Sequence, residues 1–219
     1  DGVTTRLGEN HFIMTTTSGN AAQVLDWLEE YLQTEWPDLK VYCTSVTEQF
    51  ATISIAGPKS REVLQNLSGD IDLSADAFPF MSMQTGEIAG APARIFRISF
   101  TGELSYEINV PAFYGRAVWQ AVMDAGKDCN ITPYGTETMH VLRAEKGFII
   151  VGQETDGTVI PQDLGMEKLT NRFGLIEADL SDGRARIGEE LYAPLESRAI
   201  KMRVVEPVFY DPKGERANG

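Results

Sequence analysis

Two glutamates flank a turn between two apolar stretches of the sequence. Glu103 and Glu107 lie in the segment Phe-Thr-Gly-Glu-Leu-Ser-Tyr-Glu at residues 100–107. Glu107 falls in an otherwise uncharged predicted strand, residues 106–110. A carboxylate there costs free energy unless it faces water or accepts hydrogen bonds from a partner. Because alternate residues of a strand face opposite sides, the pattern alone favours a solvent-facing Glu107, with a ligand site as the alternative.

A second pair of charged residues, Arg143 and Glu145, lies near the end of a predicted helix. Most charged side chains are solvated, so this pattern alone favours a surface or structural ion pair. The segment Gly57-Pro-Lys-Ser-Arg61 lacks the spacing of a nucleotide-binding P-loop. No Gly-x-Ser-x-Gly motif accompanies the two histidines of the chain.

The composition and net charge of the chain argue against some classes of binding partner. The 219 residues are 42% hydrophobic and 23% charged, as in an ordinary globular protein, and carry a net charge of −13. This charge repels nucleic acid and anionic membranes, so we expect neither as a partner. Cys43 and Cys129 are isolated, which indicates reduced thiols in a cytoplasmic protein rather than a metal site. The chain starts with Asp rather than Met, and we expect it to start inside a longer polypeptide.

The elements that must hold these residues alternate between strand pairs and helices. The pattern predicts a hairpin over residues 3–17, a hairpin built from residues 94–100 and 106–110, and single strands at 41–46, 51–56 and 200–205. It predicts helices over residues 20–33, 58–67, 111–125 and 136–146. This order favours an α+β fold over a doubly wound parallel sheet.

Four segments together resemble the aminomethyltransferase superfamily, which includes the glycine-cleavage T-protein. They are residues 56–64, 100–107, 142–147 and 151–156, and the resemblance covers most of residues 1–166. It implies an aminomethyltransferase-like folate-binding domain at residues 1–168, with mixed or antiparallel sheets and flanking helices. It also implies the remnant of a C-terminal β-barrel at residues 169–219. Family members carry several dozen more residues near 166–173, so we expect a shortened chain or an omitted segment there.

Within this superfamily, the amino-acid sequences of four further segments resemble those of the sarcosine oxidase alpha subunits. Residues 1–7, 42–49, 134–142 and 208–215 carry this resemblance. The glycine-cleavage branch usually has Ala-Arg-Asp before its Leu-Arg, where this chain has Thr138-Met139-His140. The resemblance implies a hetero-oligomer with the other subunits of such an oxidase. Its FAD, FMN and NAD sites would lie outside these 219 residues.

The resemblance also implies roles for individual residues. Asp1 falls on the second position of a paired-aspartate motif, which is the catalytic aspartate of the superfamily. Glu107 matches the glutamate that anchors the pterin ring of tetrahydrofolate, and a carboxylate can accept two N–H donors from that ring. The positions that line or border the ring site are Phe100, Tyr106, Thr17 and Arg143.

The implied reaction transfers the one-carbon unit of oxidised sarcosine, an iminium, to tetrahydrofolate. Its products are 5,10-methylenetetrahydrofolate and glycine, and the isolated chain would not oxidise sarcosine. Three alternatives stay open. A glycine-cleavage aminomethyltransferase would bind a lipoyl carrier, a dimethylglycine dehydrogenase relative would accept another methyl donor, and a non-catalytic module would bind folate or assist assembly without transfer.

Overall fold

A computed structural model describes residues 2–69, 71–164, 187–194, 199–203, 205, 208 and 210–218. The chain divides into two compact units, one of residues 1–140 with 213–219 and the other of residues 141–212. Asp1 and residues 169–186 of the predicted barrel-like segment lie outside the described residues. Within the described part, no helix has the length and apolar character needed to cross a membrane.

A four-stranded antiparallel sheet is the centre of the first unit. It is built from β3 (Phe50–Ala56), β4 (Ser82–Ile88), β5 (Ala91–Arg97) and β6 (Ser105–Pro111), in the order β3-β6-β5-β4. The predicted strands at 51–56 and 106–110 are confirmed, and so is the predicted pairing of 106–110 with 94–100, although β5 ends earlier, at Arg97. The sequence pattern did not predict β4, because its Gln, Thr, Gly and Glu break the apolar alternation.

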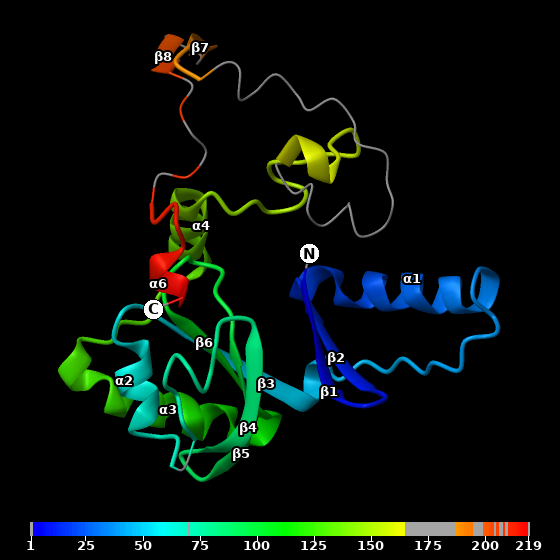
Figure 1. Cartoon of the computed structure of the whole chain (residues 1–219), viewed down its shortest axis with the longest axis vertical. Coiled ribbons are helices and arrows are strands. Elements are labelled where there is room, and N and C mark those ends of the chain that lie inside the picture. The colour runs from blue at the N-terminus through cyan, green and yellow to red at the C-terminus, as the bar shows by residue number, and fades with distance from the viewer. Residues whose placement is uncertain are drawn as a thin grey trace. The chain divides into compact units, whose positions relative to one another are not determined.

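Two helices, α2 (Ser60–Gln65) and α3 (Gly115–Ala125), pack on one face of this sheet (Figure 1). The alternation of β-strand side chains places a buried apolar set on that face. The largest members of this core on β3, β5 and β6 are Ile53, Ile55, Ile95, Tyr106, Ile108 and Val110. Gly115 permits the close approach of α3 to β3, because a Cβ atom at this position would lie 2.6 Å from the Cβ of Ala51.

The N-terminal segment forms a hairpin and a helix, as the sequence predicts. β1 (Gly2–Gly8) pairs antiparallel with β2 (His11–Thr16), and α1 spans Ala21–Thr34. The strand predicted at residues 41–46 is wrong, because this stretch has no regular structure. A strand needs a neighbour for its backbone hydrogen bonds, and none of the described strands pairs with this stretch.

The helix predicted at residues 136–146 is confirmed as α4 (Thr136–Lys146). In the second unit, β7 (Glu190–Pro194) pairs antiparallel with β8 (Ala199–Arg203), and the last described helix of the first unit is α6 (Glu215–Asn218). Antiparallel sheets with flanking helices confirm the α+β class, while the barrel remnant stays a prediction. Short 3-10 helices cover Ser18–Asn20, Thr47–Gln49, Ala112–Tyr114, Lys127–Cys129 and Pro161–Leu164.

Candidate functional site

The face of the four-stranded sheet that α2 and α3 leave free carries polar side chains from neighbouring strands. Glu107 of β6 lies in register with Ser54 of β3 on one side and with Phe96 of β5 on the other. Each of these residues alternates with core residues on its own strand, so all of them belong to the second face. The strand order therefore places an aromatic ring, a carboxylate and a hydroxyl in one cross-strand row.

A second row lies two residues along the same strands. Thr52, Asn109 and Arg94 are in register there, and Thr52 Oγ1 donates a hydrogen bond of 3.2 Å to Asn109 Oδ1. The guanidinium carbon of Arg94 lies 4.7 Å from the centre of the Phe50 ring. The buried Nδ2 of Asn109 has no hydrogen-bond partner among the described residues. The two rows give this face acceptors, donors and a cation within a small area.

The charge of the Glu107 carboxylate is not balanced by a described cation. Its side chain is half-buried, and no described lysine or arginine forms an ion pair with it. Burial raises the pKa of Glu107 above its ordinary value of 4.5, because removing water disfavours the charged form. A half-buried carboxylate in this state is suited to a ligand that brings its own N–H donors.

The charge of this carboxylate also acts on Tyr134, in the segment that precedes α4. Burial raises the pKa of the Tyr134 phenol, and the negative charge of Glu107 raises it further. The side chain of Ser54 acts in the opposite direction and lowers it. The pKa of Tyr134 therefore responds to Ser54 and Glu107, the two residues that are in register in the first row.

The turn before β6 contains Gly102 and Glu103. Gly102 has a φ of +80°, which favours glycine, and its N–H donates a 3.0 Å hydrogen bond to Ser99 Oγ. Glu103, in the same turn, accepts a 3.0 Å hydrogen bond from Arg216 Nη1. Glu103 in the turn and Glu107 in β6 thus differ, because Glu103 has a cationic partner and Glu107 has none among the described residues.

Tyr106, which was predicted to border the ring site, lies on the opposite face of the sheet from Glu107. It lies on the core face with an exposed fraction of 0%, and its ring centre is 5.8 Å from that of Phe78. Arg61 Nε donates a 3.1 Å hydrogen bond to Tyr106 Oη. A strand alternates, so a residue adjacent to Glu107 must point the other way.

The other predicted site residues of the first unit lie at different positions. Phe100 is half-buried in the segment between β5 and β6. Thr17 is exposed, and its carbonyl accepts a 2.9 Å hydrogen bond from the N–H of Asn20. The aromatic residue in register with Glu107 is Phe96 rather than Phe100. Sequence reasoning missed Phe96 and Ser54, because the pairing and register of β3, β5 and β6 place them beside Glu107.

Arg143 belongs to a network of its own in the second unit. The side chain is 7% exposed, and Nη1 lies 2.6 Å from Oε2 of Glu154. Nη1 also donates a 3.1 Å hydrogen bond to the carbonyl of Phe148, and Nη2 donates one of 3.0 Å to Gln153 Oε1. The hydrogen bond from Arg143 is the main reason why the pKa of Glu154 is lowered to about 2. Arg143 therefore anchors the segment that follows α4.

A buried ion pair lies one turn further along α4. Lys146 Nζ is 2.8 Å from Asp211 Oδ2 and donates a second hydrogen bond of 2.6 Å to the Asp211 carbonyl. Both side chains are 8% exposed. This pair joins α4 to the Asp211 segment within the second unit.

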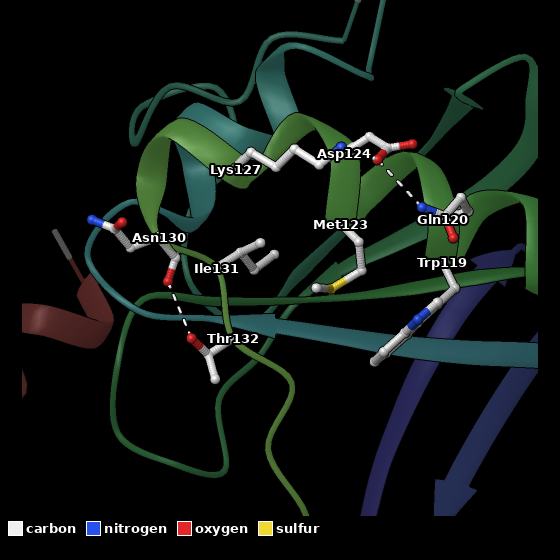
Figure 2. A pocket seen from close by; sticks show the side chains of 8 residues that line it. All are labelled: Trp119, Gln120, Met123, Asp124, Lys127, Asn130, Ile131 and Thr132. Atoms are coloured by element: carbon white, nitrogen blue, oxygen red, sulfur yellow. Dashed lines mark hydrogen bonds and ion pairs between the residues drawn. The ribbon is translucent and has the colours of Figure 1, made fainter.

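A shallow depression beside α3 is a less suitable site (Figure 2). Its one carboxylate, Asp124, already lies 2.7 Å from Lys127 Nζ and accepts a 3.3 Å hydrogen bond from Gln120. The residues that line it are Trp119, Gln120, Met123, Asp124, Lys127, Asn130, Ile131 and Thr132. Its charged groups are satisfied, so the chemistry favours the face of Glu107.

Comparison with known proteins identifies relatives of this chain. The model of the GCVT N-terminal domain family matches residues 1–172. Sarcosine oxidase subunit alpha from Corynebacterium sp. (strain U-96) is 44% identical over 289 residues, which cover 100% of this chain and 30% of that relative. The matched segment of that relative is therefore 70 residues longer than the 219 residues of this chain. The chain spans about a third of the length of the relative.

Solved structures share the fold. The glycine cleavage system aminomethyltransferase T from Bartonella henselae matches with a TM-score of 0.70 at 18% identity, over 96% of this chain and 72% of that chain. The heterotetrameric sarcosine oxidase from Corynebacterium sp. U-96, in complex with pyrrole 2-carboxylate, matches with a TM-score of 0.50 at 22% identity. That match covers 61% of this chain and 64% of that chain. At these identities the two structures show the aminomethyltransferase-like fold alone.

Proposed function

The chain belongs to the GCVT N-terminal domain family, and from this premise we propose that it is the tetrahydrofolate-binding part of a sarcosine oxidase alpha subunit. The observation that carries the proposal is the half-buried carboxylate of Glu107, which none of the described cations neutralises. It lies in a chain that is 44% identical to such a subunit along its whole length.

The pterin ring of tetrahydrofolate fits the chemistry of this carboxylate. The 2-amino-4-oxopyrimidine edge presents adjacent N–H donors, and a carboxylate accepts two of them side by side. Such hydrogen bonds to a charged group are worth about 1.5–3 kcal/mol each, which offsets the cost of desolvating Glu107. Glu107 would hold the ring in place, which is the positioning contribution to catalysis.

The reaction we propose transfers the one-carbon unit of oxidised sarcosine to tetrahydrofolate, with 5,10-methylenetetrahydrofolate and glycine as products. Oxidation itself belongs to the rest of the enzyme, whose FAD, FMN and NAD sites we place outside this chain. The other subunits of a hetero-oligomer would be its partners. The described residues contribute the folate-holding carboxylate and the fold that presents it.

Asp1 is proposed as the group that stabilises the cationic one-carbon intermediate, because a carboxylate stabilises a developing positive charge. It lies outside the described residues, so its role rests on the family resemblance alone. We expect Asp1→Asn in the intact subunit to lower the rate of methylenetetrahydrofolate formation with little effect on sarcosine oxidation. Unchanged methylenetetrahydrofolate formation would overturn this role.

The folate-binding proposal is tested by calorimetric titration of tetrahydrofolate into the purified chain. We expect Glu107→Gln to weaken binding by about 10-fold or more, because one charged acceptor is lost. Glu87→Gln is the matched control, since Glu87 is an exposed glutamate on β4. Equal affinities for the wild-type chain and Glu107→Gln would contradict the proposal. Binding without any one-carbon transfer in the intact complex would favour a non-catalytic folate-binding module.

A further inference from the structure

Arg94, in the second row of the sheet face that carries Glu107, has a positive charge that no ion pair among the described residues uses. Glu87 lies diagonally across from it on β4, yet the two side chains form no ion pair. The guanidinium lies over the Phe50 ring instead, 4.7 Å from the ring centre. A contact with an aromatic face at a partly exposed site is weaker than a charge-assisted hydrogen bond. A carboxylate of a ligand can therefore compete with the ring for this cation.

Asn109, the neighbour of Arg94 on β6, has a donor without an acceptor. Its side chain is 4% exposed, and Nδ2 is buried without a hydrogen-bond partner among the described residues. Oδ1 accepts a 3.2 Å hydrogen bond from Thr52 Oγ1 on the β3 side. The two polar atoms of a planar amide point in different directions, so Nδ2 is directed away from β3, to the side of Arg94. Buried N–H groups normally have an acceptor, which indicates that one is missing here.

The contact between Arg94 and Phe50 lies over the part of β6 that contains Asn109. β6 lies between β5 and β3, so side chains from these two outer strands meet above it. Arg94 is in register with Asn109, and Phe50 with Pro111, the second residue after Asn109. This contact accounts for the low exposure of Asn109, and a movement of the guanidinium off the ring would uncover Nδ2.

The two rows have opposite hydrogen-bonding characters. Glu107 accepts, whereas the guanidinium of Arg94 and Nδ2 of Asn109 only donate. Residues that follow each other on one face of a strand are about 7 Å apart, so one bound ligand can contact both rows. The ligand group that suits a guanidinium and an amide N–H together is a carboxylate.

We propose that Arg94 and Asn109 form a subsite for a carboxylate of the ligands that bind with the pterin ring at Glu107. The guanidinium leaves the Phe50 ring and pairs with the carboxylate, and the uncovered Nδ2 of Asn109 donates a second hydrogen bond to it. The inference rests on the proposed function, because it places the subsite next to an anchored pterin.

The proposed reaction offers two sources of this carboxylate. Glycine and its iminium precursor carry one a few bonds from the carbon that is transferred to the pterin. The glutamate tail of folate carries the other, beyond the aminobenzoyl group. The short distance between the rows favours the carboxylate of the amino acid.

The test measures two pairs of ligands by calorimetric titration into the wild-type chain and Arg94→Gln. Glycine and glycinamide, which lacks the carboxylate, are titrated into chain saturated with tetrahydrofolate. Tetrahydrofolate is compared with 6-methyltetrahydropterin, which lacks the glutamate tail. We expect wild type to prefer glycine over glycinamide, and Arg94→Gln to weaken glycine binding about 10-fold while glycinamide stays within about two-fold. Arg94→Lys should keep part of the preference, because the charge is retained.

Three further variants separate ligand binding from a structural role. Arg116→Gln is the matched control, since Arg116 is an exposed arginine on α3, and it should change no affinity. Asn109→Ala should weaken glycine binding by less than Arg94→Gln does, because it removes a neutral donor. Phe50→Leu should tighten glycine binding about two-fold, because the guanidinium no longer has a ring to leave. Weaker glycine binding in Phe50→Leu would contradict the release of Arg94. Thermal unfolding checks the fold of each variant.

The outcomes distinguish failure of this inference from failure of the proposed function. If Arg94→Gln weakens tetrahydrofolate but neither 6-methyltetrahydropterin nor glycine, the subsite is supported and its carboxylate is that of the glutamate tail. If the wild-type chain binds tetrahydrofolate and Arg94→Gln leaves both preferences unchanged, or weakens all ligands equally, the inference is overturned and the proposed function stands. If the wild-type chain does not bind tetrahydrofolate, both are overturned.

Discussion

Buried charge is unpaired at Glu107 on the second face of the sheet and paired at the end of α4. At the end of α4, Arg143 is paired with Glu154 and Lys146 with Asp211. On the second face of the sheet, Glu107 has no cationic partner within the described part of the chain, and burial raises its pKa. Buried charges in stable proteins are normally paired, so a pair indicates a structural role. A half-buried carboxylate without a partner indicates a site for a ligand.

The largest effect should follow from breaking the structural pair. Lys146→Met removes the cation that faces the buried carboxylate of Asp211 while it keeps most of the side-chain volume. We expect the free energy of unfolding to fall by about 3 kcal/mol or more, as for other broken buried pairs. Urea unfolding followed by circular dichroism measures this loss.

A double variant tests whether the loss of stability comes from leaving the Asp211 charge unpaired. Lys146→Met combined with Asp211→Asn removes both charges, and Asn tolerates the φ of +48° at position 211. We expect the double variant to be more stable than Lys146→Met alone. A loss below about 1 kcal/mol for Lys146→Met would contradict the structural role of the pair.

For Glu107 we expect the opposite effect: removing its charge should raise the free energy of unfolding. A carboxyl whose folded pKa lies above its ordinary 4.5 binds protons more tightly in the folded state. The free energy of unfolding therefore falls as the pH rises from about 4.5 through the folded pKa, and Glu107→Gln removes this decrease. We expect Glu107→Gln to be more stable than the wild-type chain above this pH range, with the difference disappearing below pH 4.5. Urea unfolding at a series of pH values measures it, and a loss of stability in the variant at neutral pH would show that the carboxylate has a structural partner.

The smallest effect should come from Glu154. Its carboxylate is 41% exposed, so solvent screens its ion pair with Arg143. We expect Glu154→Gln to lower the free energy of unfolding by less than about 1 kcal/mol at neutral pH. Because the folded pKa of about 2 is below the ordinary 4.5, the wild-type advantage should disappear as the pH falls through this range. A loss that does not depend on pH would show that charge is not the cause.

The sequence predicts the elements better than the site. Hairpins and helices with clear periodicity, such as residues 3–17 and α4, are local and were predicted within a few residues. Residues 41–46 have the composition of a strand, but strand formation depends on a neighbour that local pattern does not reveal. β4 was missed for the converse reason, since its pairing with β5 compensates for a weak local pattern.

The same limit applies to the candidate site. Glu107 could be selected from one strand, because a lone carboxylate in an apolar segment is expensive. Ser54 and Phe96 are 53 and 11 positions away in the sequence, and only strand register places them beside Glu107. Tyr106 adjoins Glu107 in sequence, yet the alternation of the strand directs it into the core.

The most direct test of the central claim is the pKa of the Glu107 carboxyl, measured by ¹³C NMR with and without tetrahydrofolate. In the free chain we expect a value above 4.5, because burial disfavours the charge. Binding of the pterin should lower it, because N–H donors stabilise the carboxylate. A pKa that stays the same when tetrahydrofolate binds would show that Glu107 does not hold the ring, and would contradict the account.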